Sequence, residues 1–131
     1  MSKDSSFVSI VEDDPFVRAS TRRLIRSFGY AVEAFSSATD FLVSPPLGET
    51  ACLIADINMP GMTGVELHRR LTEAGRRIPT ILMTAYPDDA VRTRALADGV
   101  LCYLKKPFAD DELLRCVRLA LNASRPPDKS S

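Results

Sequence analysis

Four short apolar segments of the chain each end directly at a polar residue. They cover residues 7–11, 51–55, 80–83 and 100–104, and the residues that follow them are acidic, acidic, hydroxyl-bearing and basic. Segments that are apolar throughout are typical of strands buried on both faces, as in a parallel sheet. The carboxyl ends of parallel strands share one edge of the sheet, where ligands bind. The sequence therefore predicts one site that combines carboxylates, a hydroxyl and an ammonium group.

Helical patterns alternate with these strands. A second strand is expected over residues 30–35, and helices are expected over 15–28, from a cap at Ser37 through 43, over 65–74, over 88–98, and after a cap at Asp110 or Asp111. Gly29, Gly75 and Gly99 follow three of these helices, as C-terminal stops do. Residues 44–50 contain two prolines and a glycine and predict a loop.

Five strand–helix units with nearly all-apolar strands predict an α/β fold with helices on both faces of a parallel sheet. Because crossovers between parallel strands are right-handed, few topologies remain. We predict the flavodoxin-like, doubly wound (βα)5 arrangement with strand order 2-1-3-4-5. In that order the first and third strands are neighbours, so Glu12 and Asp13 should meet Asp56 at one edge of the sheet.

Length and charge narrow the classes of function. The 131 residues suffice for one domain, and we expect a flexible start at 1–6, the domain at 7–122 and a linker or frayed tail at 123–131. Lys and Arg together number 17, as do Asp and Glu, so no positive balance favours direct binding of nucleic acid. No apolar run approaches the roughly 20 residues of a membrane span, and no apolar leader is visible. We therefore expect a cytoplasmic protein without membrane contact.

The predicted cluster of carboxylates needs a positive partner. Two unit charges about 5 Å apart repel by roughly 3 kcal/mol at an effective dielectric constant near 20. Either a pKa rises or a cation binds, and Mg²⁺ suits oxygen ligands that leave room for water and phosphate. Lys106 adds a positive charge that can contact phosphate oxygens. Asp56 is our candidate nucleophile because a carboxylate can accept a phosphoryl group, and Thr84 can donate its hydroxyl to that group.

The polar motifs also occur in the order found in one protein family. They are Val11-Glu12-Asp13-Asp14-Pro15 with Arg18, Asp56 with Met59-Pro60-Gly61-Met62 and Gly64, Thr84-Ala85, and Lys106-Pro107-Phe108. With these motifs, residues 7–122 resemble the receiver domain of bacterial two-component response regulators. The loop and strand sequences are most similar to receivers of the FixJ type, which usually precede a LuxR-type helix-turn-helix domain.

The resemblance implies a phosphorylation switch. Asp56 corresponds to the residue that accepts the phosphoryl group, and Thr84 and Lys106 correspond to residues that contact it. The bond from Lys106 to Pro107 is cis in relatives, as X–Pro bonds permit. Tyr103 matches an aromatic side chain that moves inward when the hydroxyl residue shifts toward the phosphoryl group. Thr84 and Tyr103 are therefore the expected switch residues.

The same resemblance implies a Mg²⁺ site. Counting back from Arg18 makes Asp13 the direct metal ligand and Glu12 the ligand that acts through water, together with the phosphoacceptor and the backbone carbonyl of Asn58. The alternative register would use Asp13 and Asp14 as the acidic pair. In the first register Asp14 is available to cap the following helix.

The implied partner is a sensor histidine kinase. The expected readout face consists of the helix at 88–98, the fifth strand and the last helix, and it would form a homodimer or contact a LuxR-type output domain. Such a domain catalyses only its own phosphorylation and dephosphorylation. We therefore expect this protein to be a signalling module rather than a metabolic enzyme.

Two other functions remain open. A phosphohydrolase with an aspartyl nucleophile can use a similar fold, but it commonly carries a second acid where this chain has Asn58. An interaction domain that works without phosphorylation would not need the complete set of polar residues. A P-loop nucleotide site is excluded because no GxxxxGK motif occurs.

Several charged or polar side chains are expected in solvent rather than in the site. They are His68, which lies before Arg69 and Arg70, Lys105, and the arginines of the first helix, namely Arg18, Arg22, Arg23 and Arg26.

Overall fold

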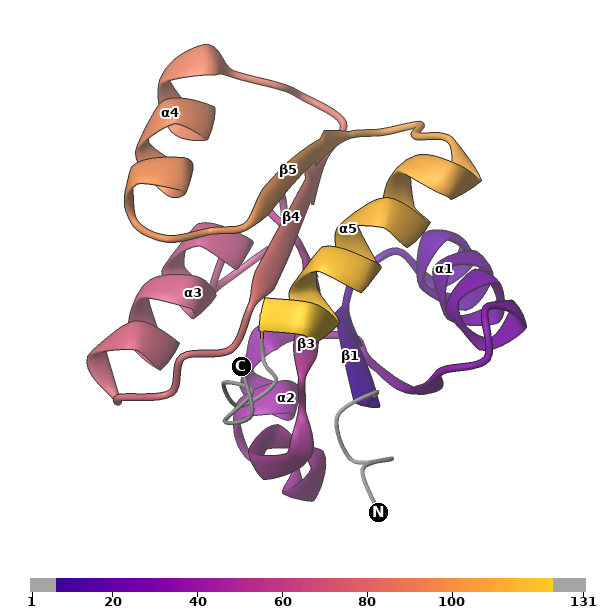
Figure 1. The fold of residues 1–131 in the computed structure, drawn as a ribbon. Helices are drawn as coiled ribbons and strands as arrows, with labels where there is room; N and C mark the ends of the chain where they lie inside the picture. The colour runs from indigo at the N-terminus through magenta and orange to yellow at the C-terminus, as the bar shows by residue number, and fades with distance from the viewer. Residues whose placement is uncertain (1–6, 124–131) are drawn as a thin grey trace, which may run out of the picture.

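The apolar segments pair in parallel in the computed structural model of the protein, which describes residues 7–123 (Figure 1). Five strands form one sheet in the order β2-β1-β3-β4-β5, and every pair of neighbours is parallel. The predicted α/β fold and its strand order are therefore confirmed. The expected flexible start at 1–6 and the tail at 124–131 lie outside the described residues.

The bounds of the elements agree with the sequence patterns to within about two residues at most ends. The strands are β1 (Phe7–Val11), β2 (Ala31–Phe35), β3 (Cys52–Asp56), β4 (Thr80–Thr84) and β5 (Cys102–Lys105). The helices are α1 (Pro15–Ser27), α2 (Ala38–Leu42), α3 (Gly64–Glu73), α4 (Asp89–Ala97) and α5 (Asp110–Ala123). Ala123, expected in the tail, is the last residue of α5.

The sheet separates two apolar cores. One lies between the sheet and helices α1 and α5, and the other lies between the sheet and helices α2, α3 and α4 (Figure 1). Successive strand residues supply opposite cores, as Ile54 on one face and Leu53 on the other illustrate. Each fully buried side chain of this size contributes about 1.5–3 kcal/mol relative to an exposed one. Burial on both faces explains why the strands are apolar throughout.

Side-chain caps fix where several helices begin. Asp14 Oδ1 accepts hydrogen bonds from the backbone N–H groups of Phe16 (2.8 Å) and Val17 (3.2 Å), as expected for the cap of α1. Thr63 and Glu66 form a reciprocal capping box at the start of α3. The loops that follow β1 and β3 lie at the same edge of the sheet because these strands are parallel, and the caps fix where each loop ends.

The expected cap of the last helix is wrong. Asp110 and Asp111 are not the cap but lie inside the first turn of α5. Glu112 accepts the backbone N–H of Ala109 at 3.2 Å, which satisfies a donor at this end. Acidic residues are favourable both at the cap and in the first turn, because the helix dipole is positive there, so composition does not separate the two positions.

Two further expectations differ from the structure. The predicted loop at 44–50 contains a 3₁₀ helix, Pro45–Glu49. His68, expected in solvent, is buried on a side of α3 that lies near Asp98, the C-cap residue of α4, and near Leu101. Burial lowers the pKa of His68. The helical pattern of Leu67 and Leu71 indicates the buried stripe of α3 but not how wide it is.

Within residues 7–123, none of the helices combines the length and the apolar character that a membrane span requires.

Gly64 allows α3 to begin directly beside the end of β3. A Cβ atom at this position would lie 2.6 Å from the backbone carbonyl oxygen of Asp56 and 3.1 Å from a side-chain carbon of Leu82. The first contact is shorter than packed atoms tolerate, and a backbone atom cannot move away by changing rotamer. Glycine at position 64 therefore sets how closely α3 approaches the strand end that carries Asp56.

Replacing Gly64 with alanine is expected to lower the free energy of unfolding by about 1–3 kcal/mol, because the added methyl group overpacks against backbone. Urea denaturation followed by circular dichroism measures the change. Gly48→Ala is the matched control, since a Cβ atom there meets nothing within 4 Å. Equal effects of the two substitutions would contradict the steric explanation.

Candidate functional site

Three acidic side chains meet at the carboxyl edge of the sheet. Each of Glu12, Asp13 and Asp56 offers one carboxylate oxygen, and these three atoms lie within 4.8 Å of one another. The parallel register produces this meeting, because Val11 of β1 pairs with Ala55 of β3 and the acids follow directly. Glu12 is fully buried and Asp56 is 3% exposed, whereas Asp13 is exposed. The cluster thus has a buried side and a side open to solvent.

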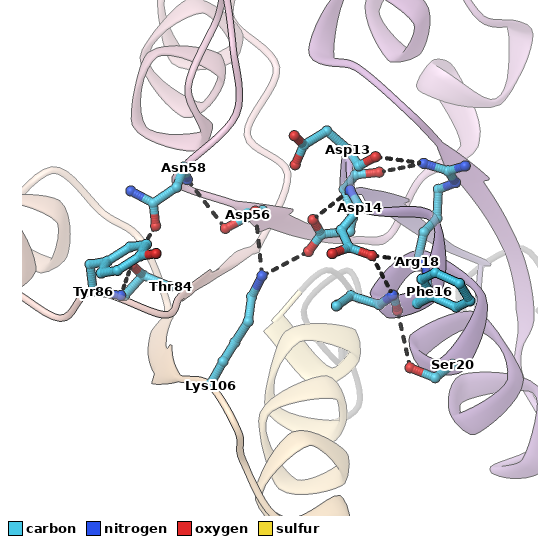
Figure 2. Close-up of polar contacts among 12 residues, drawn as sticks. Asp13, Asp14, Phe16, Arg18, Ser20, Asp56, Asn58, Thr84, Tyr86 and Lys106 are labelled. Carbon is cyan, nitrogen blue, oxygen red and sulfur yellow. Dashed lines mark hydrogen bonds and ion pairs between the residues drawn. The ribbon is translucent and has the colours of Figure 1, made fainter.

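Lys106 provides the positive charge on the buried side of this cluster (Figure 2). Its Nζ atom donates a hydrogen bond to Glu12 Oε1 at 3.0 Å and lies 3.4 Å from Asp56 Oδ2. The other oxygen of Glu12 accepts the backbone N–H of Asp14 at 3.1 Å. One ammonium group is therefore shared by two buried carboxylates. The bond between Lys106 and Pro107 is cis, as expected.

Burial is the largest single influence on the pKa values of Glu12 and Lys106, but it decides the direction of the shift only for Glu12. It raises the pKa of Glu12 to about 7, and the nearby charge of Asp56 acts in the same direction. The hydrogen bonds from Asp14 and Lys106 lower the pKa of Glu12 but do not cancel the effect of burial. Burial by itself lowers the pKa of Lys106, yet the hydrogen bond and charge of Glu12, with those of Asp56, raise it overall. Lys106 therefore stays charged, while Glu12 can be protonated near neutral pH.

The donor atoms of the acidic cluster fit a hard divalent cation. All are carboxylate oxygens, which Mg²⁺ prefers, and exposed Asp13 leaves space for the water molecules that Mg²⁺ retains. Among residues 7–123, the ion pairs of the cluster join Lys106 to Glu12 and Asp56 and leave the Asp13 carboxylate unpaired. That carboxylate points away from the ammonium group of Lys106 (Figure 2). The side of the cluster that a cation would approach is therefore not blocked.

A second polar group lies beside Asp56 and joins the loops after β3 and β4 (Figure 2). The backbone N–H of Asn58 donates to Asp56 Oδ1 at 3.2 Å, and the hydroxyl of Thr84 donates to Asn58 Oδ1 at 2.7 Å. Thr84 Oγ1 also accepts the backbone N–H of Tyr86 at 2.9 Å. Thr84 is 1% exposed, so its hydroxyl is confined to these partners.

Tyr103 lies apart from the acidic cluster. It packs beside the core under α2, α3 and α4, and its hydroxyl accepts the backbone N–H of Asp88 at 3.1 Å. Asp88 in turn caps α4 through its own side chain. The segment between β4 and α4 is thus attached at one end to Thr84 and at the other end to Tyr103.

Arg18 contributes to the site in a way that the sequence interpretation missed. Its Nη1 atom donates to the backbone carbonyl oxygens of Glu12 at 2.9 Å and Asp13 at 3.3 Å, and the residue is half-buried rather than solvated. A guanidinium group can bind two neighbouring carbonyl groups in this way and hold the backbone of the acidic pair. Arg18 follows the acidic pair by five and six positions, near the start of α1, but this spacing alone does not reveal a contact with backbone carbonyl groups.

Among the residues predicted to form the site, Glu12, Asp13, Asp56 and Lys106 come together as expected, and Thr84 lies next to them through Asn58. Asp14 is the helix cap, which favours the register in which Glu12 and Asp13 are the acidic pair. Lys105 is exposed, as expected.

Comparison with known proteins gives a consistent result. Residues 8–118 match the family model of the response regulator receiver domain. The response regulator protein TodT of Pseudomonas putida is 38% identical to the chain over 121 residues, which cover 92% of this chain and 53% of TodT. The transcriptional regulatory protein FixJ of Bradyrhizobium diazoefficiens is 32% identical over 123 residues, which cover 94% of this chain and 60% of FixJ. The expected similarity to FixJ is therefore confirmed.

Solved structures show the same fold. The structure of the response regulator StyR has a TM-score of 0.82 and 38% sequence identity, covering 90% of this chain and 60% of that chain. The chain thus spans between about half and three fifths of the length of these relatives. A LuxR-type output domain stays a prediction.

The affinity for Mg²⁺ is expected to rise with pH by up to about tenfold per pH unit between about pH 6 and pH 7 and then to level off. The reason is that Glu12, with a pKa of about 7, must lose its proton for the cluster to carry its full negative charge. Isothermal titration calorimetry across this range measures the affinity. In Glu12→Gln the dependence near pH 7 should disappear, and an unchanged slope in that variant would contradict the assignment.

Proposed function

The chain belongs to the response regulator receiver family of two-component signalling, and from this premise we propose that Asp56 accepts a phosphoryl group from the phosphohistidine of a sensor histidine kinase. A carboxylate oxygen of Asp56 forms a bond to phosphorus while the P–N bond of the phosphohistidine breaks and the imidazole leaves. The observation that carries the proposal is the position of Asp56, which joins the acidic cluster on one side and Lys106 on the other.

The residues around Asp56 suit this transfer. Asp13 and Asp56 would hold Mg²⁺ together with the backbone carbonyl of Asn58, and Glu12 would act through water. Bound Mg²⁺ supplies positive charge that offsets the carboxylate and phosphoryl oxygens. The protein's own contribution is position and charge, since phosphoryl transfer needs little other covalent chemistry from the protein.

Lys106 and Thr84 are the groups that would bind the new anion. A phosphoryl group carries a charge near −2 and three strong acceptor oxygens. Lys106 can donate to one of these oxygens, and it already lies 3.4 Å from Asp56 Oδ2. Thr84 can donate its hydroxyl to another after leaving Asn58. Both residues are candidates because Thr84 ends β4, the neighbour of the strand that carries Asp56, and Lys106 directly follows β5.

The segment between β4 and α4 would carry the signal. Thr84 holds the backbone N–H of Tyr86, and Tyr103 holds the backbone N–H of Asp88. A shift of Thr84 would therefore weaken the hydrogen bond to Tyr86 and change how the segment and the α4 cap are held. This change biases an equilibrium between two arrangements of the segment. The proposed readout is the face formed by α4, β5 and α5, which would dimerise or contact an output domain. FixJ, a longer relative, is named as a transcriptional regulatory protein.

The kinase would approach over α1. Phe16 is 84% exposed on this helix, and a groove with a cavity volume of about 710 Å³ lies between α1 and the start of α5. Leu24 and Phe108 line the groove, and so does Lys106, whose ammonium group contacts Glu12 and lies 3.4 Å from Asp56 Oδ2. An apolar surface near the phosphoacceptor suits a helical partner that carries the phosphohistidine.

As a phosphoacceptor for a kinase, the domain would be a signalling module that catalyses only its own phosphorylation and dephosphorylation.

Incubation with acetyl phosphate and Mg²⁺ is expected to add the mass of one phosphoryl group to the intact protein, as measured by mass spectrometry. Asp56→Asn should remain unmodified because an amide is not a competent nucleophile. Asp111→Asn, at an exposed acid in α5, is the matched control and should be modified like the wild type. An unmodified wild type, or full modification of Asp56→Asn, would contradict the proposal.

A further inference from the structure

We propose that the side chain of Asn58 is a latch that holds the Thr84 hydroxyl away from the phosphorylation site, and that this latch must open before Thr84 can bind a phosphoryl oxygen. The inference rests on the proposed function of Asp56, but the latch itself is a property of the unphosphorylated protein. Asn58 is thereby a positioning residue that acts through Thr84.

The hydrogen bonds of Thr84 leave its hydroxyl with nothing further to donate. Thr84 Oγ1 accepts the backbone N–H of Tyr86 at 2.9 Å and donates to Asn58 Oδ1 at 2.7 Å. A hydroxyl group has a single proton, so the donor of Thr84 is fully used by Asn58. The side chain is 1% exposed, so bulk water does not readily replace this acceptor. Thr84 can reach a phosphoryl oxygen only by giving up its bond to Asn58.

Asn58 contacts both the proposed phosphoacceptor and the hydroxyl residue that would bind the phosphoryl group. Its backbone N–H donates to Asp56 Oδ1 at 3.2 Å, while its side chain accepts from Thr84 (Figure 2). A phosphoryl group on Asp56 would therefore directly disturb the hydrogen bond between Asp56 and the backbone of Asn58. The residue is exposed, so its side chain can turn into solvent and regain hydrogen bonds with water. The latch is thus weak enough to open but specific enough to fix Thr84 beforehand.

The latch raises the free energy of the activated arrangement relative to the unphosphorylated one, because the hydrogen bond from Thr84 to Asn58 must be broken to reach it. Removal of the Asn58 acceptor should favour that arrangement by the net contribution of one hydrogen bond, which corresponds to roughly a threefold to tenfold change in an equilibrium constant. The backbone carbonyl at position 58 is retained in any substitution, so a metal ligand from that group is preserved.

The first measurement uses the full chain without metal or phosphoryl donor. Three-bond NMR couplings from the Thr84 methyl carbon to the backbone report the χ1 rotamer. We expect couplings of a single rotamer in the wild type, averaged couplings in Asn58→Ala, and wild-type couplings in Asn58→Asp, which keeps an acceptor of equal length. Asn122→Ala, at an exposed position of α5, is the matched control and should resemble the wild type. Averaged couplings in the wild type, or an unchanged single rotamer in Asn58→Ala, would overturn the latch.

The second measurement titrates the same proteins with beryllium fluoride in the presence of Mg²⁺, as a mimic of the phosphoryl group. Asn58→Ala should bind roughly threefold to tenfold more tightly than the wild type. In a Thr84→Val background, which lacks the hydroxyl, the same substitution should change the affinity little, because the two residues are coupled. Equal gains in both backgrounds would overturn the proposal. If the wild type does not bind the mimic, the proposed phosphorylation fails, whereas the couplings still decide whether Asn58 holds Thr84.

Discussion

One ammonium group allows two buried carboxylates to lie side by side at the edge of the sheet. Lys106 contacts Glu12, 94 positions earlier in the chain, and lies 3.4 Å from Asp56 in the central strand β3. Without this charge the repulsion between the acids would be uncompensated in a region of low dielectric constant. The compensation is incomplete, because burial, together with the smaller effect of the charge of Asp56, still raises the pKa of Glu12 to about 7. The edge of the sheet therefore still favours a further cation, with Asp13 on its open side.

A chain of hydrogen bonds leads from this charged cluster toward the face formed by α4 and β5. It passes from Asp56 through Asn58 to Thr84 and then to the backbone of Tyr86. Two residues later, the backbone of Asp88 is held by Tyr103 from β5. A short segment supported at both ends can take up discrete arrangements, because the loss of either hydrogen bond leaves a polar group to be satisfied elsewhere. This gives a change of charge at Asp56 a physical route to α4.

The sequence interpretation succeeded for strands and failed at details that depend on neighbouring elements. Apolar runs predict buried parallel strands because both faces of the sheet are covered, and right-handed crossovers left few strand orders, among them the observed flavodoxin-like one. His68 was misplaced because the width of the buried side of α3 depends on where α4 ends. Asp110 was misplaced because acidic residues suit either the cap or the first turn of a helix. Arg18 was assigned to solvent, since spacing alone does not reveal a contact with backbone carbonyl groups.

By itself, the sequence determined the fold class, the strand order, the meeting of Glu12 and Asp13 with Asp56, and the family resemblance. These features follow from period, from residue type and from the rule that parallel strands end at one edge. Only the tertiary structure decided that Lys106 is shared between two acids, that Gly64 must lack a side chain, and that Asn58 contacts Thr84 through its amide. The reason is that such contacts join loops distant in sequence, and their distances depend on how the loops pack rather than on any local pattern of residues.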